Sequence, residues 1–140
     1  MNMSRIIALD YGAKRTGIAV TDPLKIIATG LTTINSVDLI PFLKNYFVNE
    51  VVELIIIGMP VNWDESDTHG TSLVKKAIVK INKEFPTMPL KEVDERYTSK
   101  MAKQAMLDMG LKKKDRRDKK LVDEIAATII LQEYLQSISG

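Results

Sequence analysis

Residues 5–20 read RIIALDYGAKRTGIAV. This segment contains an apolar run that ends in an acid, then a glycine-containing turn, and then a second apolar run. Apolar and β-branched residues bounded by turn signals predict buried strands at 5–10 and 16–21. The short turn requires these two strands to be antiparallel neighbours. Asp10 then closes a buried strand, where an ionised carboxylate costs several kcal/mol unless something positive compensates it. We therefore expect a positive group or a cation opposite Asp10.

The rest of the chain alternates between strand and helix patterns. Short apolar runs bounded by Gly or Pro predict further strands at 27–34, 51–58 and 89–94. Pro41 fits a helix only within its first turn, and Gly110 is a typical helix C-cap. Helical spacing of apolar residues predicts helices over residues 36–50, 72–85, 98–110 and 121–135.

This order of elements predicts an α/β fold. Three antiparallel strands are extended by two parallel strands through helix crossovers, which gives a mixed five-stranded sheet with helices on both faces. The 140 residues, 45% of them hydrophobic and 27% charged, fit a single domain over residues 1–140.

Composition excludes several kinds of chemistry. The chain has no cysteine, which excludes thiolate catalysis and cysteine–zinc sites, and His69 is its one histidine. No apolar stretch approaches the ~20 residues that span a bilayer, and no signal peptide is evident. We expect a cytoplasmic protein whose chemistry uses carboxylates.

Carboxylates are expected to meet at one edge of the sheet. Asp10 ends the first strand, and Asp94 and Glu95 end the last strand, which runs parallel to it, so these acids share the edge where α/β sheets bind ligands. Asp123 lies on the inward face of the last helix, because its neighbours three, four, seven and eight positions on are apolar. These neighbours are Ala126, Ala127, Ile130 and Leu131, and the alanines allow a close approach to the sheet.

Three such carboxylates without histidine or cysteine suit a hard cation such as Mg²⁺. Two such ions can activate a water and stabilise the leaving oxygen of a phosphodiester. Structural interpretations remain open for each acid. Asp10 can bond turn amides, Glu95 can pair with Arg96, and Asp123 can pair with Lys120.

Basic character is concentrated at 112–120, KKKDRRDKK, which favours contact with a polyanion as much as it favours a solvated linker. Lys14 and Arg15 lie at the mouth of the expected site, where they contact a phosphate or face solvent. Gly12 and Gly17 match no phosphate-binding loop, and a tight hairpin accounts for both.

Four segments together resemble the YqgF (RuvX) family: ALDYGAKRTGIAVTD, IIIGMPVN, VDERYTS and KKLVDEIAATIILQEYL. The resemblance covers nearly the whole chain. It implies an RNase H-like fold and the activity of small Holliday-junction-resolvase-like proteins described as nucleases that mature precursor 16S rRNA. It places the catalytic and metal-binding acids on Asp10, Glu95 and Asp123.

The resemblance also implies that Lys14, Arg15 and Arg96 lie near the substrate. Asn62 and Asp64 match the family's loop, but ESDTHG follows where the family has a different sequence. We add four residues of the basic stretch as candidate phosphate contacts: Lys112, Lys113, Arg116 and Arg117.

The expected function is that of a nuclease dependent on Mg²⁺ or Mn²⁺ that cuts structured nucleic acid, with the 5′ end of precursor 16S rRNA as the leading substrate. One alternative is a nucleic-acid-binding or transcription-associated factor with the same fold, and another is a Holliday junction resolvase. An actin-like ATPase is a weaker alternative, because that fold needs two such domains. Phosphate contacts alone do not distinguish RNA from DNA.

Overall fold

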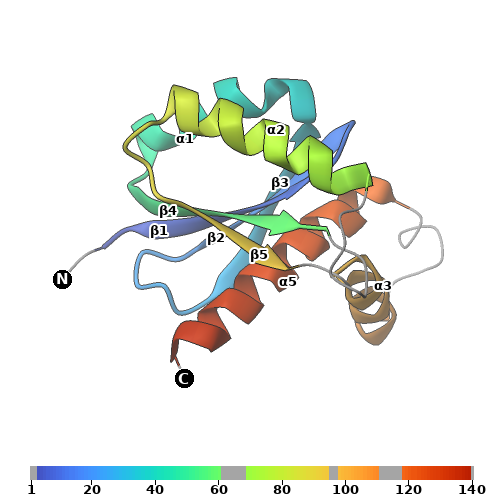
Figure 1. Cartoon of the computed structure of the whole chain (residues 1–140). Coiled ribbons are helices and arrows are strands. Elements are labelled where there is room, and N and C mark those ends of the chain that lie inside the picture. Colours follow the sequence, from blue (N-terminus) through green and yellow to red (C-terminus); the bar gives the residue numbers. More distant parts are fainter. Residues whose placement is uncertain (1–2, 61–68, 95–97, 111–117, 140) are drawn as a thin grey trace.

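The computed structural model describes residues 3–60, 69–94, 98–110 and 118–139, and a five-stranded sheet forms its centre (Figure 1). The sheet has the strand order β3-β2-β1-β4-β5. Its strands are β1 (Arg5–Tyr11), β2 (Arg15–Thr21), β3 (Ala28–Asn35), β4 (Val52–Met59) and β5 (Leu90–Asp94). The helices are η1 (Ser36–Asp38), α1 (Leu39–Asn49), α2 (His69–Glu84), α3 (Thr98–Asp108) and α5 (Lys119–Ser139).

The first strand is the central one. It pairs with β2 in the antiparallel sense and with β4 in the parallel sense, while β3 and β5 form the two edges. Parallel neighbours end at the same side of a sheet, so the carboxyl ends of β1, β4 and β5 lie together. This mixed sheet confirms the predicted arrangement of three antiparallel and two parallel strands.

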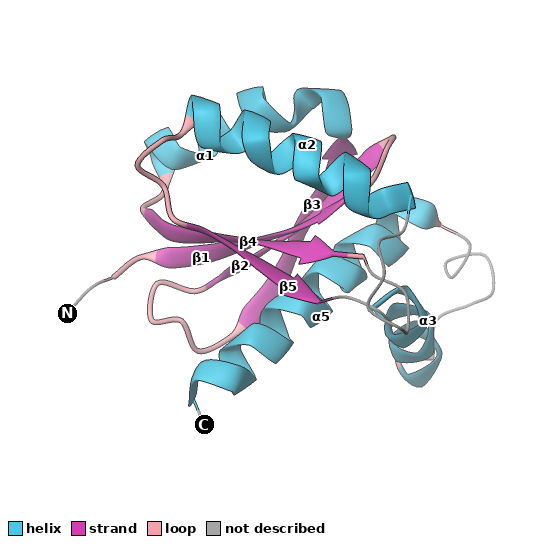
Figure 2. Ribbon diagram, in the orientation of Figure 1, coloured by secondary structure: helices cyan, strands magenta, loops and turns pink. Residues whose placement is uncertain are grey.

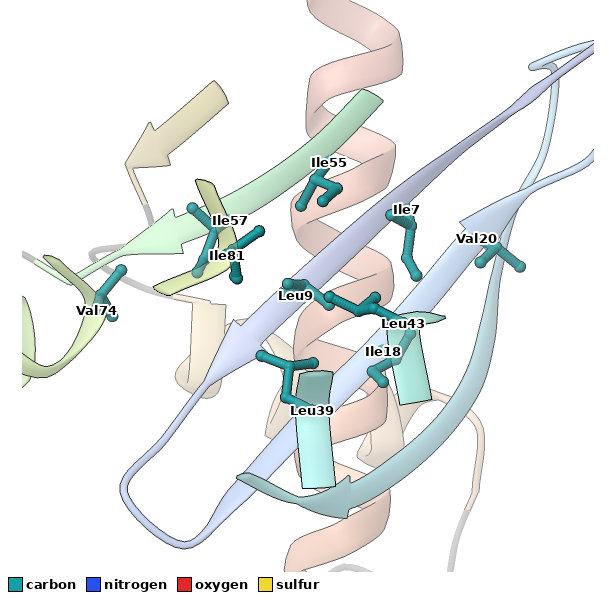
Figure 3. Packing of buried hydrophobic residues seen from close by; sticks show 10 residues of the cluster. All are labelled: Ile7, Leu9, Ile18, Val20, Leu39, Leu43, Ile55, Ile57, Val74 and Ile81. Carbon is teal, nitrogen blue, oxygen red and sulfur yellow. The ribbon is translucent and has the colours of Figure 1, made fainter. Parts of the chain in front are cut away.

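One face of the sheet packs against α1 and α2 (Figure 2). Alternate residues of β1, Ile7 and Leu9, point to this face and pack with Leu39 and Leu43 of α1. Figure 3 shows these side chains converging with those of the neighbouring strands and of α2. Pro41 lies in the first turn of α1, as the sequence predicts.

The other face packs against α5, and α3 packs against α5 in turn (Figure 2). Ile6 and Ala8 of β1 point to this face and pack against the apolar stripe of α5. That stripe is buried as predicted: Ala126, Ala127, Ile130 and Leu131. None of the helices in the described ranges is long and apolar enough to cross a membrane.

Small residues let α5 lie very close to the sheet. A methyl group built on Gly17 of β2 would overlap the carbonyl group of Asp123 and come within 3.0 Å of the amide nitrogen of Glu124. The turn explanation for this glycine is therefore wrong, because the contact with α5 requires it. The turn explanation holds for Gly12, whose amide donates to the Arg15 carbonyl at 2.9 Å.

We predict that Gly17→Ala destabilises the fold by about 1–3 kcal/mol, the usual cost of overpacking, because the groups it meets are helix backbone and cannot turn aside. Urea unfolding measures the change. Gly30→Ala is the matched control: its methyl would lie 2.6 Å from Oε1 of Glu124, a side chain that can adopt another rotamer. Equal unfolding midpoints for the two variants would contradict this close approach of helix and sheet.

Candidate functional site

Asp10 lies near the carboxyl end of the central strand, and the residue is partly buried. Side chains alternate along β1, so Asp10 follows Ile6 and Ala8 onto the face that α5 covers. Across the antiparallel pair of β1 and β2, the Cα atom of Asp10 lies opposite the Cα atom of Gly17. Such Cα atoms lie about 4.5–5.5 Å apart. Asp10 is therefore beside the point at which α5 touches the sheet.

Asp123 is brought to the same point by the helix. Its backbone lies directly over Gly17, and its side chain is partly buried with 23% exposure. Glycine on the strand and alanines one turn along the helix allow this approach, so even a short side chain reaches the edge of the sheet. The structure thus places two of the three predicted acids, Asp10 and Asp123, on one face at neighbouring positions.

Arg15 supplies a positive charge at this position. Its Nε donates to Oδ2 of Asp123 at 2.9 Å, across 108 residues of sequence. Because Arg15 is on β2 in the same alternation as Gly17, it also points to the face of α5. A positive group is therefore present at this edge, paired with Asp123. Within the described residues, the ion pair of Asp123 is with Arg15 and not with Lys120.

Hydrogen bonds from Ser36, a residue outside the hairpin, hold the turn that contains Lys14 and leads into Arg15. The amide of Ser36 donates to the Lys14 carbonyl at 2.9 Å, and its hydroxyl donates to the Gly12 carbonyl at 2.6 Å. A hydroxyl has one proton to donate, so the 2.8 Å bond between the Ser36 and Thr16 hydroxyls takes its proton from Thr16. Lys14 itself is exposed in this turn.

The register of β5 decides the face of the sheet on which Asp94 lies. Leu90 packs in the cluster beneath α1 and α2, whereas Val93 packs in the cluster beneath α5. Asp94 shares the alternation of Leu90, so its side chain belongs to the face away from α5. The remaining predicted residues lie outside the described part of the chain: Glu95, Arg96, Asn62, Lys112, Lys113, Arg116 and Arg117.

The chemistry of the described acids fits a hard divalent cation. Asp10 and Asp123 offer carboxylate oxygens at neighbouring positions, and oxygen is the ligand that Mg²⁺ and Mn²⁺ take. Among the residues that the structure describes, no group of three or more side chains of the metal-ligating types lies together.

Sequence reasoning missed the groups that hold this site in place. Ser36 and Thr16 are buried hydroxyl residues, 24 and 20 residues from their respective partners Gly12 and Ser36. The partners of the Arg15–Asp123 pair are farther apart still in sequence. Nothing local in the sequence marks these contacts, since serine, threonine and arginine are ordinary residues at a turn.

Residues 4–137 of the chain match a family model described as RuvX, Holliday junction resolvase. Among curated relatives, a protein of Christiangramia forsetii is 56% identical over 133 residues, covering 95% of this chain and 98% of the relative. Proteins of Bacteroides fragilis and Porphyromonas gingivalis are 51% and 47% identical, each over 96% of this chain and 98% of the relative. All three carry the name "Putative pre-16S rRNA nuclease".

Two solved structures share the arrangement of sheet and helices. Thermus thermophilus RuvC in complex with a Holliday junction substrate has a TM-score of 0.55 at 14% identity, over 98% of this chain and 96% of that one. A second Thermus thermophilus RuvC structure gives 0.52 at 13% identity, over 97% and 96%. At this identity the likeness concerns the fold, and it confirms the predicted RNase H-like architecture.

We predict that Ser36→Ala lowers the free energy of unfolding by about 1–3 kcal/mol, because it leaves the buried Thr16 hydroxyl and the Gly12 carbonyl without their partner. Ser137→Ala is the control, since that exposed hydroxyl bonds only within its own helix. We expect the control to change stability by less than about 0.5 kcal/mol. Adding Thr16→Val to Ser36→Ala should recover part of the loss, and equal stability of the two serine variants would refute the network.

Proposed function

The chain belongs to the RuvX family, and we propose that it is a divalent-metal-dependent nuclease that hydrolyses phosphodiester bonds of structured nucleic acid. The observation that supports this most directly is the position of Asp10 and Asp123, which α5 and β1 bring to neighbouring places at one sheet edge. Neither a buried core nor a simple turn requires two acids there.

We assign three acids to the cation. Asp10, Glu95 and Asp123 would hold Mg²⁺ or Mn²⁺, which when bound supplies an activated water and stabilises charge on the leaving oxygen, in the two-metal manner. Glu95 is chosen over Asp94 because Asp94 falls on the face of β5 away from α5.

Basic and polar side chains around the acids would hold the substrate. Lys14 lies in the turn between β1 and β2, and Arg15, which begins β2, lies next to Asp123. In the sequence, Arg96 and Asn62 follow β5 and β4, two strands whose carboxyl ends lie at this edge of the sheet. Phosphate contacts of this kind fix the register of a nucleic acid strand without reading its sequence.

Precursor 16S rRNA is the substrate we propose, since the relatives that cover nearly the whole chain carry that name. Processing of its 5′ end during ribosome biogenesis would place the protein in the cytoplasm. We propose that residues 1–140 act as one nuclease domain. The family description favours a Holliday junction as the second candidate substrate.

We predict that Asp10→Asn, Glu95→Gln and Asp123→Asn each reduce cleavage by roughly 100-fold or more, the scale for loss of one group that stabilises charge in the transition state. Labelled precursor 16S rRNA and a four-way DNA junction are incubated with each protein and Mg²⁺ or Mn²⁺. The better substrate separates the two candidates.

Asp94→Asn is the matched control, and it should cleave as the wild type does. If Asp94→Asn is inactive and Glu95→Gln is active, the assignment of the third acid is wrong. If wild-type protein binds both nucleic acids but cleaves neither, the chain is a binding factor and the nuclease proposal fails.

We also propose that the basic stretch contacts the phosphate backbone. Changing Lys112, Lys113, Arg116 and Arg117 together to Ala should weaken binding of all sequences alike. The slope of log affinity against log salt should flatten by roughly 0.7–0.9 for each phosphate interaction that the substitutions remove. Fluorescence anisotropy over a KCl series measures the slope. An unchanged slope would show that the stretch is a solvated linker and makes no phosphate contacts.

A further inference from the structure

The guanidinium of Arg15 is tied to Asp123 by one hydrogen bond. Nε lies 2.9 Å from Oδ2, and within the described residues the structure records no further hydrogen bond or ion pair for either side chain. Arginine and a carboxylate can form two parallel hydrogen bonds, and that forked geometry is the strong form of the pair. The terminal amino groups of Arg15 and Oδ1 of Asp123 thus retain capacity for other partners.

This ion pair lies at the open edge of the site. The side chains of Arg15 and Asp123 are 29% and 23% exposed, so both are partly desolvated yet reachable. Arg15 and Asp10 point to the same face of the sheet from neighbouring strands. The guanidinium therefore occupies the neighbourhood of the acids that the proposed function assigns to a cation.

We propose that Arg15 is a latch that competes with a divalent cation for Asp123, and that cation binding frees its guanidinium to contact a phosphate of the nucleic acid. The proposal rests on the proposed function, because it needs both the cation and the nucleic acid. It makes Arg15 a group that couples the two binding events.

Electrostatics favours competition over joint occupancy. A guanidinium and a divalent cation on one carboxylate are like charges within a few ångströms, and they repel each other most where water is partly excluded. The single Nε bond is readily exchanged, since it lacks the second bond of the forked pair. A phosphate offers Arg15 that forked geometry, which the Asp123 carboxylate does not use.

The first test measures cation affinity without any substrate. Isothermal titration of Mn²⁺ into Arg15→Gln should give binding roughly 30-fold tighter than in wild type, the effect of removing one unit charge about 4 Å from a divalent cation in water. Lys14→Gln is the matched control, because it removes the same charge from the adjacent exposed position, and its Mn²⁺ affinity should change less. Arg15→Lys keeps the charge and should stay near wild type.

The second test measures binding of a fluorescein-labelled RNA hairpin in EDTA and in Ca²⁺, which replaces Mn²⁺ to limit cleavage. Arg15→Gln should match wild type in EDTA and bind more weakly in Ca²⁺, with a salt slope lower by roughly 0.7–0.9. Lys14→Gln should lose the same affinity in both conditions. In the Asp123→Asn background, where the ion pair between Arg15 and Asp123 is absent, Arg15→Gln should lower the slope in EDTA as well.

A third measurement uses wild-type protein alone, so that no variant has to fold. The Nε–H signal of Arg15 in nitrogen-15 NMR should shift and exchange faster with water when Mg²⁺ is added, because its hydrogen bond to Asp123 is broken. An unchanged signal overturns the latch. So does an Arg15→Gln variant with unchanged or weaker Mn²⁺ affinity, or one that loses RNA affinity equally in both conditions.

Failure of the latch and failure of the nuclease proposal give different results. If wild type cleaves RNA or the DNA junction and Arg15→Gln binds Mn²⁺ as wild type does, only the latch is wrong. If wild type cleaves neither, yet Arg15→Gln tightens Mn²⁺ binding and loses RNA only in Ca²⁺, the latch stands without the nuclease. A wild-type protein that binds no Mn²⁺ overturns both.

Discussion

The contact between the backbone of α5 and Gly17 sets the distance on which the candidate site depends. A helix normally stands off a sheet by the length of its side chains, and a short carboxylate on such a helix would not reach a strand end. Gly17 has no side chain at the point of contact on the sheet, and the helix has the small side chains of Ala126 and Ala127 near it. The helix backbone then meets the sheet, and Asp123 arrives beside Asp10.

Charge at this edge is partly balanced within the protein. Two carboxylates at neighbouring, partly buried positions would repel each other, and desolvation would add to that cost. Arg15 offsets part of it through its ion pair with Asp123. The turn that presents Arg15 is held by the hydroxyls of Ser36 and Thr16, so the electrostatics of the site depend on a hydrogen-bond network on the opposite face of the sheet.

Local patterns were sufficient to predict the elements and the strand order, because alternation and helical spacing record which side of each element is buried. They also placed Asp10 and Asp123 correctly, since both follow from the end of a strand and the inward stripe of a helix. They failed for Gly17, Arg15 and Ser36. The partners of these residues are brought near only by the tertiary fold, and a glycine in a hairpin looks the same whether the turn or a distant helix requires it.

The order of the elements along the chain also bears on when the site can exist. Asp10 comes from the first strand, and Asp123 comes from the last helix. During synthesis the hairpin of β1 and β2 leaves the ribosome early, but its α5-facing side stays uncovered until the final helix follows. A nascent or truncated chain therefore carries Asp10 and Arg15 without Asp123, and the candidate site is assembled only after α5 has been synthesised.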